Sequence, residues 1–305
     1  MPPLVAVTGA TGNVGTALVQ LLLQNGVRVR ALARNRKKLT PLVVKGAEER
    51  SGDLQDTGFL VEALRGVDVV FAMIPEHSNV TDFLGDKRRT AANLAQAIRK
   101  ACVARAVVLS AVGVDPPSGI GPAAANAEFE EMLRTLPGLS VVALRAAFLM
   151  ENLVASIQII KSAGINGSPM RADVALAMIC TRDIASVATE YLSAPTFEGY
   201  AVRQLLGPRD YTYREATSIL GASIGKPDLA YVEFPYEEFR KGLTAAGFSP
   251  NTVDAVVELF TALNEGRVQK MARRDALSTT PTTLEEFARD VFAPAYRAYG
   301  VSSNI

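Results

Sequence analysis

The chain has 305 residues, of which 49% are hydrophobic and 21% charged, a balance typical of a globular protein with a sizeable core. Its 32 lysines and arginines oppose 31 aspartates and glutamates, so the net charge of +1 gives no overall attraction to nucleic acid or to an anionic membrane. A single histidine and two widely separated cysteines exclude a His-rich or Cys-rich metal centre. We therefore expect no metal, and neither nucleic acid nor membrane as a partner.

The N-terminal residues lack the positive flank and long apolar stretch of a signal peptide. No apolar run approaches the ~20 residues that span a bilayer, which predicts a cytoplasmic protein. Cys102 and Cys180 each lie in an apolar run, which favours buried, unpaired thiols over a disulfide or a catalytic thiol.

The first half of the chain alternates strand and helix patterns. Leu4–Val7 is a short β-branched strand, a helix with apolar residues on one face starts at Val14, and Asn25-Gly26 ends it. The pattern continues with strand Val27–Ala33, strand Asp68–Ile74, a helix around Lys87–Cys102, strand Ala106–Ala111, helix Asn126–Leu136 and strand Ser140–Ala146. Strands separated by helices predict an α/β fold, a doubly wound parallel Rossmann sheet with helices on both faces.

Beyond Ala147 this regular alternation weakens. The patterns predict helix Met150–Ala163, a link Gly164–Ser168, strand Val174–Cys180, helix Thr181–Leu192, strands Tyr200–Leu206 and Leu229–Phe234, and helices Tyr213–Ile224, Tyr236–Ala246, Thr252–Leu263 and Leu284–Tyr299. We expect residues 1–155, with 174–195 returning to them, to form the Rossmann domain. Residues 156–173 and 196–305 then form a smaller, mostly helical α/β lobe for a substrate or partner, and the two lobes share a cleft.

The turn after the first strand carries glycines at positions 9, 12 and 15. This spacing between a strand and a helix suits a tight turn, a backbone close to a pyrophosphate, and close packing of the helix on the strand. Amides of the first helical turn then face the ligand with the positive end of the helix dipole. The predicted cofactor contacts in this turn are Gly9, Thr11, Gly12, Asn13 and Val14.

The end of the second strand indicates which dinucleotide binds. Where sites selective for NAD carry Asp or Glu for the ribose 2′-hydroxyl, this chain has Arg34, followed by a basic run that includes Lys38. An arginine can pair with a 2′-phosphate, so the sequence predicts NADP(H) as the cofactor. The alternative interpretation is a solvated basic turn.

Further candidates follow the next three strands, at the edge where ligands bind in open parallel sheets. Asp53 either accepts a hydrogen bond from the adenine amino group or closes a turn, and both interpretations stay open. The remaining cofactor candidates at this edge are Leu54, Met73, Ile74, Pro75, Ser110 and Ala111.

With these residues in view, the chain resembles the NmrA-like family of atypical short-chain dehydrogenases/reductases. The resemblance rests on Thr8–Gly15, Arg34–Leu39, Gly52–Leu54, Leu144–Asn152 and Thr181–Ile184. It implies a Rossmann fold that binds NADP(H). Members of the family include NADPH-dependent reductases of quinones, phenylpropanoid ethers, isoflavones and other conjugated molecules. Others are transcriptional co-regulators that bind the cofactor without turnover.

The usual acid–base residues are absent from this sequence. None of the eight tyrosines is followed four residues later by a lysine, and Asn126 stands where the resemblance to the phenylpropanoid reductases places a lysine. Asparagine cannot act as an acid or base, although it can bind a substrate oxygen. His77 is a candidate proton donor, or a solvated loop residue. Phe148 and Asn152 follow the sixth strand and either border the nicotinamide or belong to ordinary packing.

Two hypotheses follow. The first is an NADPH-dependent reductase that transfers hydride to a small conjugated acceptor such as a quinone, an enone or an aromatic natural product. The alternative is a non-catalytic NADP(H)-sensing regulator that binds a protein partner. The sequence is compatible with either a monomer or a homodimer.

Overall fold

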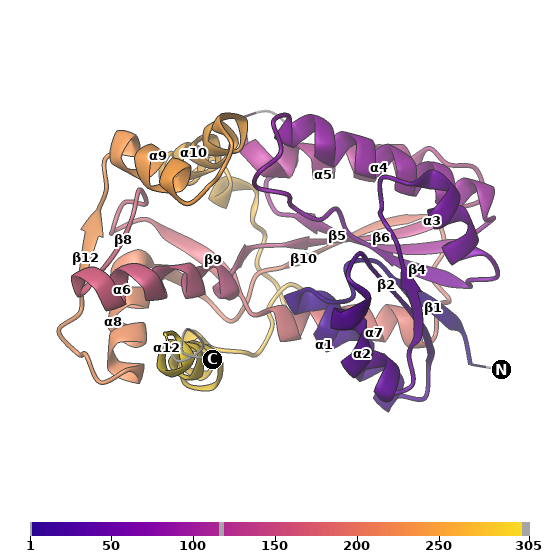
Figure 1. Ribbon diagram of the computed structural model, residues 1–305, viewed down its shortest axis with the longest axis horizontal. Coiled ribbons are helices and arrows are strands. Elements are labelled where there is room, and N and C mark those ends of the chain that lie inside the picture. Colours follow the sequence, from indigo (N-terminus) through magenta and orange to yellow (C-terminus); the bar gives the residue numbers. More distant parts are fainter. Residues whose placement is uncertain (1, 116–118, 301–305) are drawn as a thin grey trace.

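A seven-stranded parallel sheet forms the centre of the computed structural model, which describes residues 2–115 and 119–300 (Figure 1). The strand order is β10-β6-β5-β4-β1-β2-β3, and every neighbouring pair is parallel. The strands are β1 Leu4–Val7, β2 Arg28–Ala33, β3 Glu48–Ser51, β4 Val69–Ala72, β5 Arg105–Ala111, β6 Ser140–Ala146 and β10 Tyr200–Leu205. The winding reverses between β1 and β4, which creates a crevice at their carboxyl ends.

Three helices cover each face of this sheet. On one face lie α1 Asn13–Gln24, α2 Arg36–Val44 and α7 Thr181–Ser193, and on the other α3 Thr57–Leu64, α4 Phe83–Lys100 and α5 Ala124–Arg134 (Figure 1). Successive strand residues point to opposite faces, so Phe71 packs into one apolar cluster and Val70 into the other. The predicted doubly wound α/β fold is confirmed.

A second group of elements lies beside the sheet and has its own apolar core around Met150, Met178 and Phe287 (Figure 1). Its strands are β7 Phe148–Leu149, β9 Ala175–Ile179 and β11 Asp210–Thr212 in one small sheet, and β8 Ile165–Ser168 and β12 Ala230–Glu233 in another. Its helices are α6 Ile157–Ala163, α8 Tyr213–Ser223, α9 Tyr236–Ala245, α10 Pro250–Asn264, α11 Leu284–Phe287 and α12 Ala293–Ala298. No helix within the described ranges is long and apolar enough to cross a membrane.

Two strands lie elsewhere than the sequence predicts. The strand expected at Tyr200–Leu206 in the smaller lobe is β10, which pairs with β6 at the edge of the main sheet. The strand expected at Val174–Cys180 with the Rossmann domain is β9, which pairs with β7 and β11 outside that sheet. Helix α7 alone returns to pack beside α1. Pairing partners are non-local, so periodicity along the chain does not reveal them.

Several predicted local elements also differ. The link expected at Gly164–Ser168 contains strand β8, and the helix expected at Met150–Ala163 starts as a 3-10 segment, Met150–Ser156. The helix expected at Leu284–Tyr299 is divided by a π-helical segment, Ala288–Phe292, before α12. Pro294 sits in the first turn of α12 and has no amide hydrogen to continue the α-helical ladder.

The two cysteines have different environments. Cys180 is buried, and burial, followed by the charge of Glu151, raises the pKa of its thiol to about 12. Cys102 is exposed, so its predicted burial is wrong. It follows the end of α4 with a φ of 54°, and this left-handed turn points the side chain away from the apolar run.

Glu130 on α5 connects the helix with the edge strand β10 and with its neighbour β6. Its carboxylate is 3% exposed and accepts hydrogen bonds from Arg145 on β6, the shortest at 2.7 Å, and from the Tyr200 hydroxyl on β10 at 2.6 Å. Burial and then this hydrogen bond raise the pKa of Tyr200 above its ordinary value, so the phenol stays protonated and remains a donor. The second partner of Arg145 is the exposed Asp115.

We predict that Glu130→Ala destabilises the fold by about 3–5 kcal/mol, because it leaves a largely buried arginine without its main counter-charge. Urea unfolding followed by circular dichroism measures the loss. The neighbouring Glu131→Ala is the control, since Glu131 makes only an exposed ion pair with Arg134. Equal stabilities of the two variants would contradict the structural role of Glu130.

Candidate cofactor and acceptor site

The turn between β1 and α1 brings glycines against the end of the sheet. Gly9 has a φ of 62°, and a Cβ there would lie 2.6 Å from the sulfur of Met73. A Cβ on Gly15 would lie 2.2 Å from the Gly9 carbonyl oxygen. Gly12 is exposed, and a Cβ on it would approach only to 3.4 Å. The protein's own packing therefore requires glycine at positions 9 and 15, whereas Gly12 leaves room on the solvent side.

The N-terminus of α1 is open toward this side. Gly12 is the N-cap residue, and no side chain in the described part of the chain accepts a hydrogen bond from the amides of the first turn. Asn13 is exposed and Thr11 half-buried, whereas Val14 is buried and anchors the helix in the core. Free amides at the positive end of a helix are suited to binding an anionic group.

The basic turn predicted to select the cofactor lies directly after β2. Arg34 and Lys38 are exposed. Among the residues that the structure describes, Arg36 pairs with Glu49 at 2.5 Å, and Arg34 is in no ion pair. Asn35 caps α2 by accepting a hydrogen bond from the Lys38 amide at 3.4 Å. The turn therefore has a defined backbone and leaves the Arg34 guanidinium available.

The residues after β3 have contacts of their own. The Asp53 carboxylate accepts a hydrogen bond from the Gln55 amide at 2.9 Å, so it does close a turn. It is also exposed, which leaves its second oxygen available to a ligand. Leu54 is 7% exposed and packs in the core between the sheet and α3.

The carboxyl ends of β4 and β5 are neighbours in the sheet. The Met73 amide donates to the Thr8 hydroxyl at 2.9 Å, which ties the end of β4 to the glycine turn. Ile74 is buried and Pro75 half-buried. On β5, Ala111 is half-buried. The hydroxyl of Ser110 is buried and has no hydrogen-bond partner among the described residues.

Three predicted site residues come from later segments. Asn126 lies in the first turn of α5, half-buried, and its side chain makes no hydrogen bond with a described residue. Asn152 is exposed in the 3-10 segment. Phe148 packs edge-on against Tyr213, with ring centroids 6.1 Å apart, in the core of the second lobe. Phe148 is half-buried, so its contact with the nicotinamide stays a prediction.

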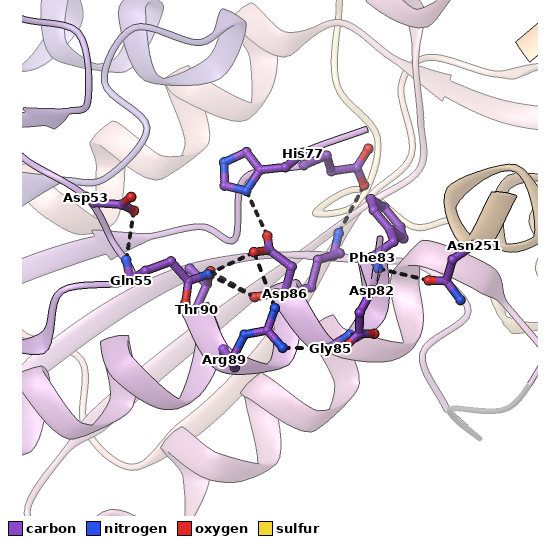
Figure 2. A network of polar contacts seen from close by, with 12 residues as sticks. Asp53, Gln55, His77, Asp82, Phe83, Gly85, Asp86, Arg89, Thr90 and Asn251 are labelled. Atoms are coloured by element: carbon purple, nitrogen blue, oxygen red, sulfur yellow. Dashed lines mark hydrogen bonds and ion pairs between the residues drawn. The ribbon is translucent and has the colours of Figure 1, made fainter. Parts of the chain in front are cut away.

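His77 belongs to a polar network (Figure 2). Its Nδ1 lies 2.7 Å from Oδ2 of Asp86 on α4, and the two side chains are only 12% and 11% exposed. Gln55 donates to the other oxygen of Asp86 at 3.2 Å and to the hydroxyl of Thr90 at 2.6 Å. His77 is thus a largely buried, oriented imidazole and not a solvated loop residue.

Asp86 and Gln55 were not among the predicted site residues. Asp86 lies nine positions after His77 on a different element, so no spacing rule relates the two. The only local signal is an acidic residue in the first turn of a helix, which stabilises many helices through the dipole.

Segments of the second lobe meet the loop between β4 and α4. The Ser249 amide donates to the Ser78 carbonyl at 3.0 Å. The Phe83 amide donates to the Asn251 side chain at 2.8 Å (Figure 2). These contacts place the start of α10 beside the loop that carries His77. No cluster of three or more metal-ligating side chains occurs in the described part of the chain.

The parallel sheet with its glycine turn and open helix N-terminus defines a dinucleotide-binding Rossmann protein. The model of the NmrA-like family matches residues 1–288, and the chain belongs to this family.

Several known proteins are similar to this chain over most of their length. An NAD(P)H azoreductase from Xenophilus azovorans is 29% identical, covering 84% of this chain and 86% of its own. A (4-alkanoyl-5-oxo-2,5-dihydrofuran-3-yl)methyl phosphate reductase from Streptomyces griseus is 31% identical, covering 84% and 85%. The solved structure of the NADPH-dependent quinone oxidoreductase of Escherichia coli with NADPH superposes with a TM-score of 0.74 at 24% identity, covering 94% of this chain and 99% of that one.

We predict that Gly15→Ala destabilises the protein by about 1–3 kcal/mol, the usual cost of overpacking. The new Cβ must displace the Gly9 carbonyl, so binding of a dinucleotide should weaken as well. Thermal unfolding and calorimetry measure the two effects. Gly242→Ala on α9 is the matched control, because a Cβ there meets nothing within 4 Å. Wild-type stability of the Gly15 variant would contradict the close approach.

Proposed function

We propose that the protein is an NADPH-dependent reductase that transfers hydride to a small conjugated acceptor. The observation that carries the proposal is the open turn at Gly12 and α1, followed at the end of β2 by Arg34, which is exposed and makes no ion pair with a described residue. Three relatives named as an azoreductase, a reductase of a dihydrofuranone methyl phosphate and a quinone oxidoreductase support it.

The residues fit such a cofactor. A pyrophosphate can accept hydrogen bonds from the first-turn amides of α1, and Gly12 presents no side chain in its way. Arg34 can pair with the 2′-phosphate, and Lys38 adds positive charge. We assign the remaining contacts to residues at the carboxyl edge of the sheet, among them Asp53, Met73 and Ser110. When bound, NADPH supplies the hydride, and these residues hold it next to the acceptor.

The acceptor then lies between the carboxyl ends of β4 to β6 and the second lobe. Asn126 in α5 can donate a hydrogen bond to a substrate oxygen, but its amide N–H is too weakly acidic to act as a general acid. A reductase of activated double bonds does not need the tyrosine–lysine pair, because a conjugated acceptor spreads the negative charge that hydride addition creates.

The test is NADPH oxidation by the pure protein with a panel of quinones, enones and azo compounds, followed by absorbance and compared with protein-free reactions. We expect turnover with at least one class. Binding of the cofactor without any turnover would contradict the proposal and favour the alternative, a regulator that senses NADP(H) and binds a protein partner.

Arg34→Asp should weaken NADP(H) binding by on the order of 1–3 kcal/mol, the scale of a charged hydrogen bond, and NAD(H) binding much less. Calorimetric dissociation constants for both cofactors give the ratio. Lys45→Ser, at the opposite end of α2, should leave the ratio unchanged. If Arg34→Asp also leaves the ratio of the two dissociation constants unchanged, Arg34 does not bind the 2′-phosphate.

A further inference from the structure

Of the two ring nitrogens of His77, one has a hydrogen-bond partner in the described structure and the other has none. Nδ1 contacts Asp86, whereas Nε2 is buried and has no hydrogen-bond partner among residues 2–115 and 119–300. A buried polar atom without a partner is unfavourable unless a ligand satisfies it. The partnerless Nε2 therefore indicates that His77 has a function beyond its contact with Asp86.

Asp86 fixes which nitrogen is free. Its carboxylate oxygens accept hydrogen bonds, so the nitrogen facing it, Nδ1, carries a hydrogen. Gln55 at 3.2 Å and Arg89 at 3.7 Å contact the other carboxylate oxygen and hold it in place. Nε2 is then the nitrogen left for a ligand.

The loop that carries His77 is itself held at several points. The preceding residue, Glu76, pairs at 3.0 Å with Lys87, whose side chain is 2% exposed and lies next to Asp86 in α4. Two consecutive loop residues thus pair with two consecutive helix residues. The hydrogen bond from Ser249 to Ser78 ties the other side of the loop to the second lobe. This bracing orients the imidazole before any ligand arrives.

A second unpaired group lies at the same edge of the sheet. The Ser110 hydroxyl is buried and without a partner at the end of β5, the strand next to β4. Side chains alternate along a strand, so Ser110 faces the same side as Ala106 and Val108, which pack with α4. The α4 side of the sheet is also where His77 meets Asp86.

We propose that His77, positioned by Asp86, is the proton donor to the reduced acceptor, and that it adapts the enzyme to acceptors whose hydride adduct is a strong base, such as azo compounds. This inference rests on the proposed reductase function. Hydride forms a bond to one atom of the double bond, and the π electron pair moves to the other atom. That atom takes the proton from Nε2 as the Nε2–H bond breaks, and water reprotonates the neutral imidazole.

Acceptors differ in how much they need this proton. Hydride addition to a quinone leaves a hydroquinone anion, a weak base that exchanges protons with water. Addition to an N=N bond leaves a nitrogen anion, a far stronger base that requires a proton during the transfer. General acid catalysis contributes about 10²–10⁴-fold where it operates. The effect of removing His77 should therefore depend on the acceptor.

The experiment compares kcat/KM for an azo compound and a quinone in the wild type, His77→Gln and Asp86→Asn, each with NADPH. We expect His77→Gln to lower the azo-to-quinone ratio at least about tenfold. Asp86→Asn should lower the ratio in the same direction. The control is Asp173→Asn, an exposed aspartate that pairs with Arg171.

A second readout does not depend on turnover. His77 is the single histidine of the chain, so nitrogen-15 and carbon-13 NMR report its tautomer without assignment. We expect one tautomer with hydrogen on Nδ1 at high pH in the wild type, and a mixture in Asp86→Asn. Hydrogen on Nε2 alone in the wild type would overturn the proposed orientation.

The outcomes separate the two proposals. An unchanged azo-to-quinone ratio in His77→Gln, or an equal loss with both acceptors, would overturn the proton-donor role and leave the reductase function standing. Failure of the wild type to oxidise NADPH with any acceptor would overturn both.

Discussion

The close approach of α1 to β1 at Gly9 and Gly15 is the contact on which the rest of the site depends. It places the first helical turn directly over the carboxyl end of the sheet, where no described side chain caps its amides. The same turn packs on Met73 at the end of β4, and the Thr8 hydroxyl fixes that contact. Because the winding reverses between β1 and β4, the crevice and the anion-binding amides coincide.

The proposed acceptor side depends on different interactions. Side chains of a loop and a helix pair here, His77 with Asp86 and Glu76 with Lys87, and Asn251 of α10 contacts the start of α4. Removing such groups from water costs free energy that the pairing only partly returns. We therefore expect these paired side chains to contribute more to the orientation of His77 than to the free energy of unfolding.

The sequence was informative where structure depends on neighbouring residues. The alternating strands and helices, the glycine turn and the basic turn at Arg34 all follow from local periodicity or from backbone conformations that only glycine allows easily. Non-local features could not be read in this way. The place of β10 depends on pairing with β6, and the orientation of His77 depends on Asp86, nine residues away on another element. The exposure of Cys102 depends on a single left-handed residue.

The two halves of the proposed site should respond differently to substitution, because one is formed by main-chain amides and the other by side chains. Main-chain amides are present whatever the side chain, so the proposed cofactor site should change only when a residue blocks the turn or alters the charge at Arg34. The proposed acceptor site depends on side-chain contacts, so one substitution at Asp86 or Asn126 should change its chemistry while the sheet beneath stays intact. A scaffold of this kind can keep its cofactor site while substitutions change which acceptor it binds. In this chain, the oriented imidazole of His77 is an example of a side chain that substitution can add to the acceptor site without altering the cofactor site.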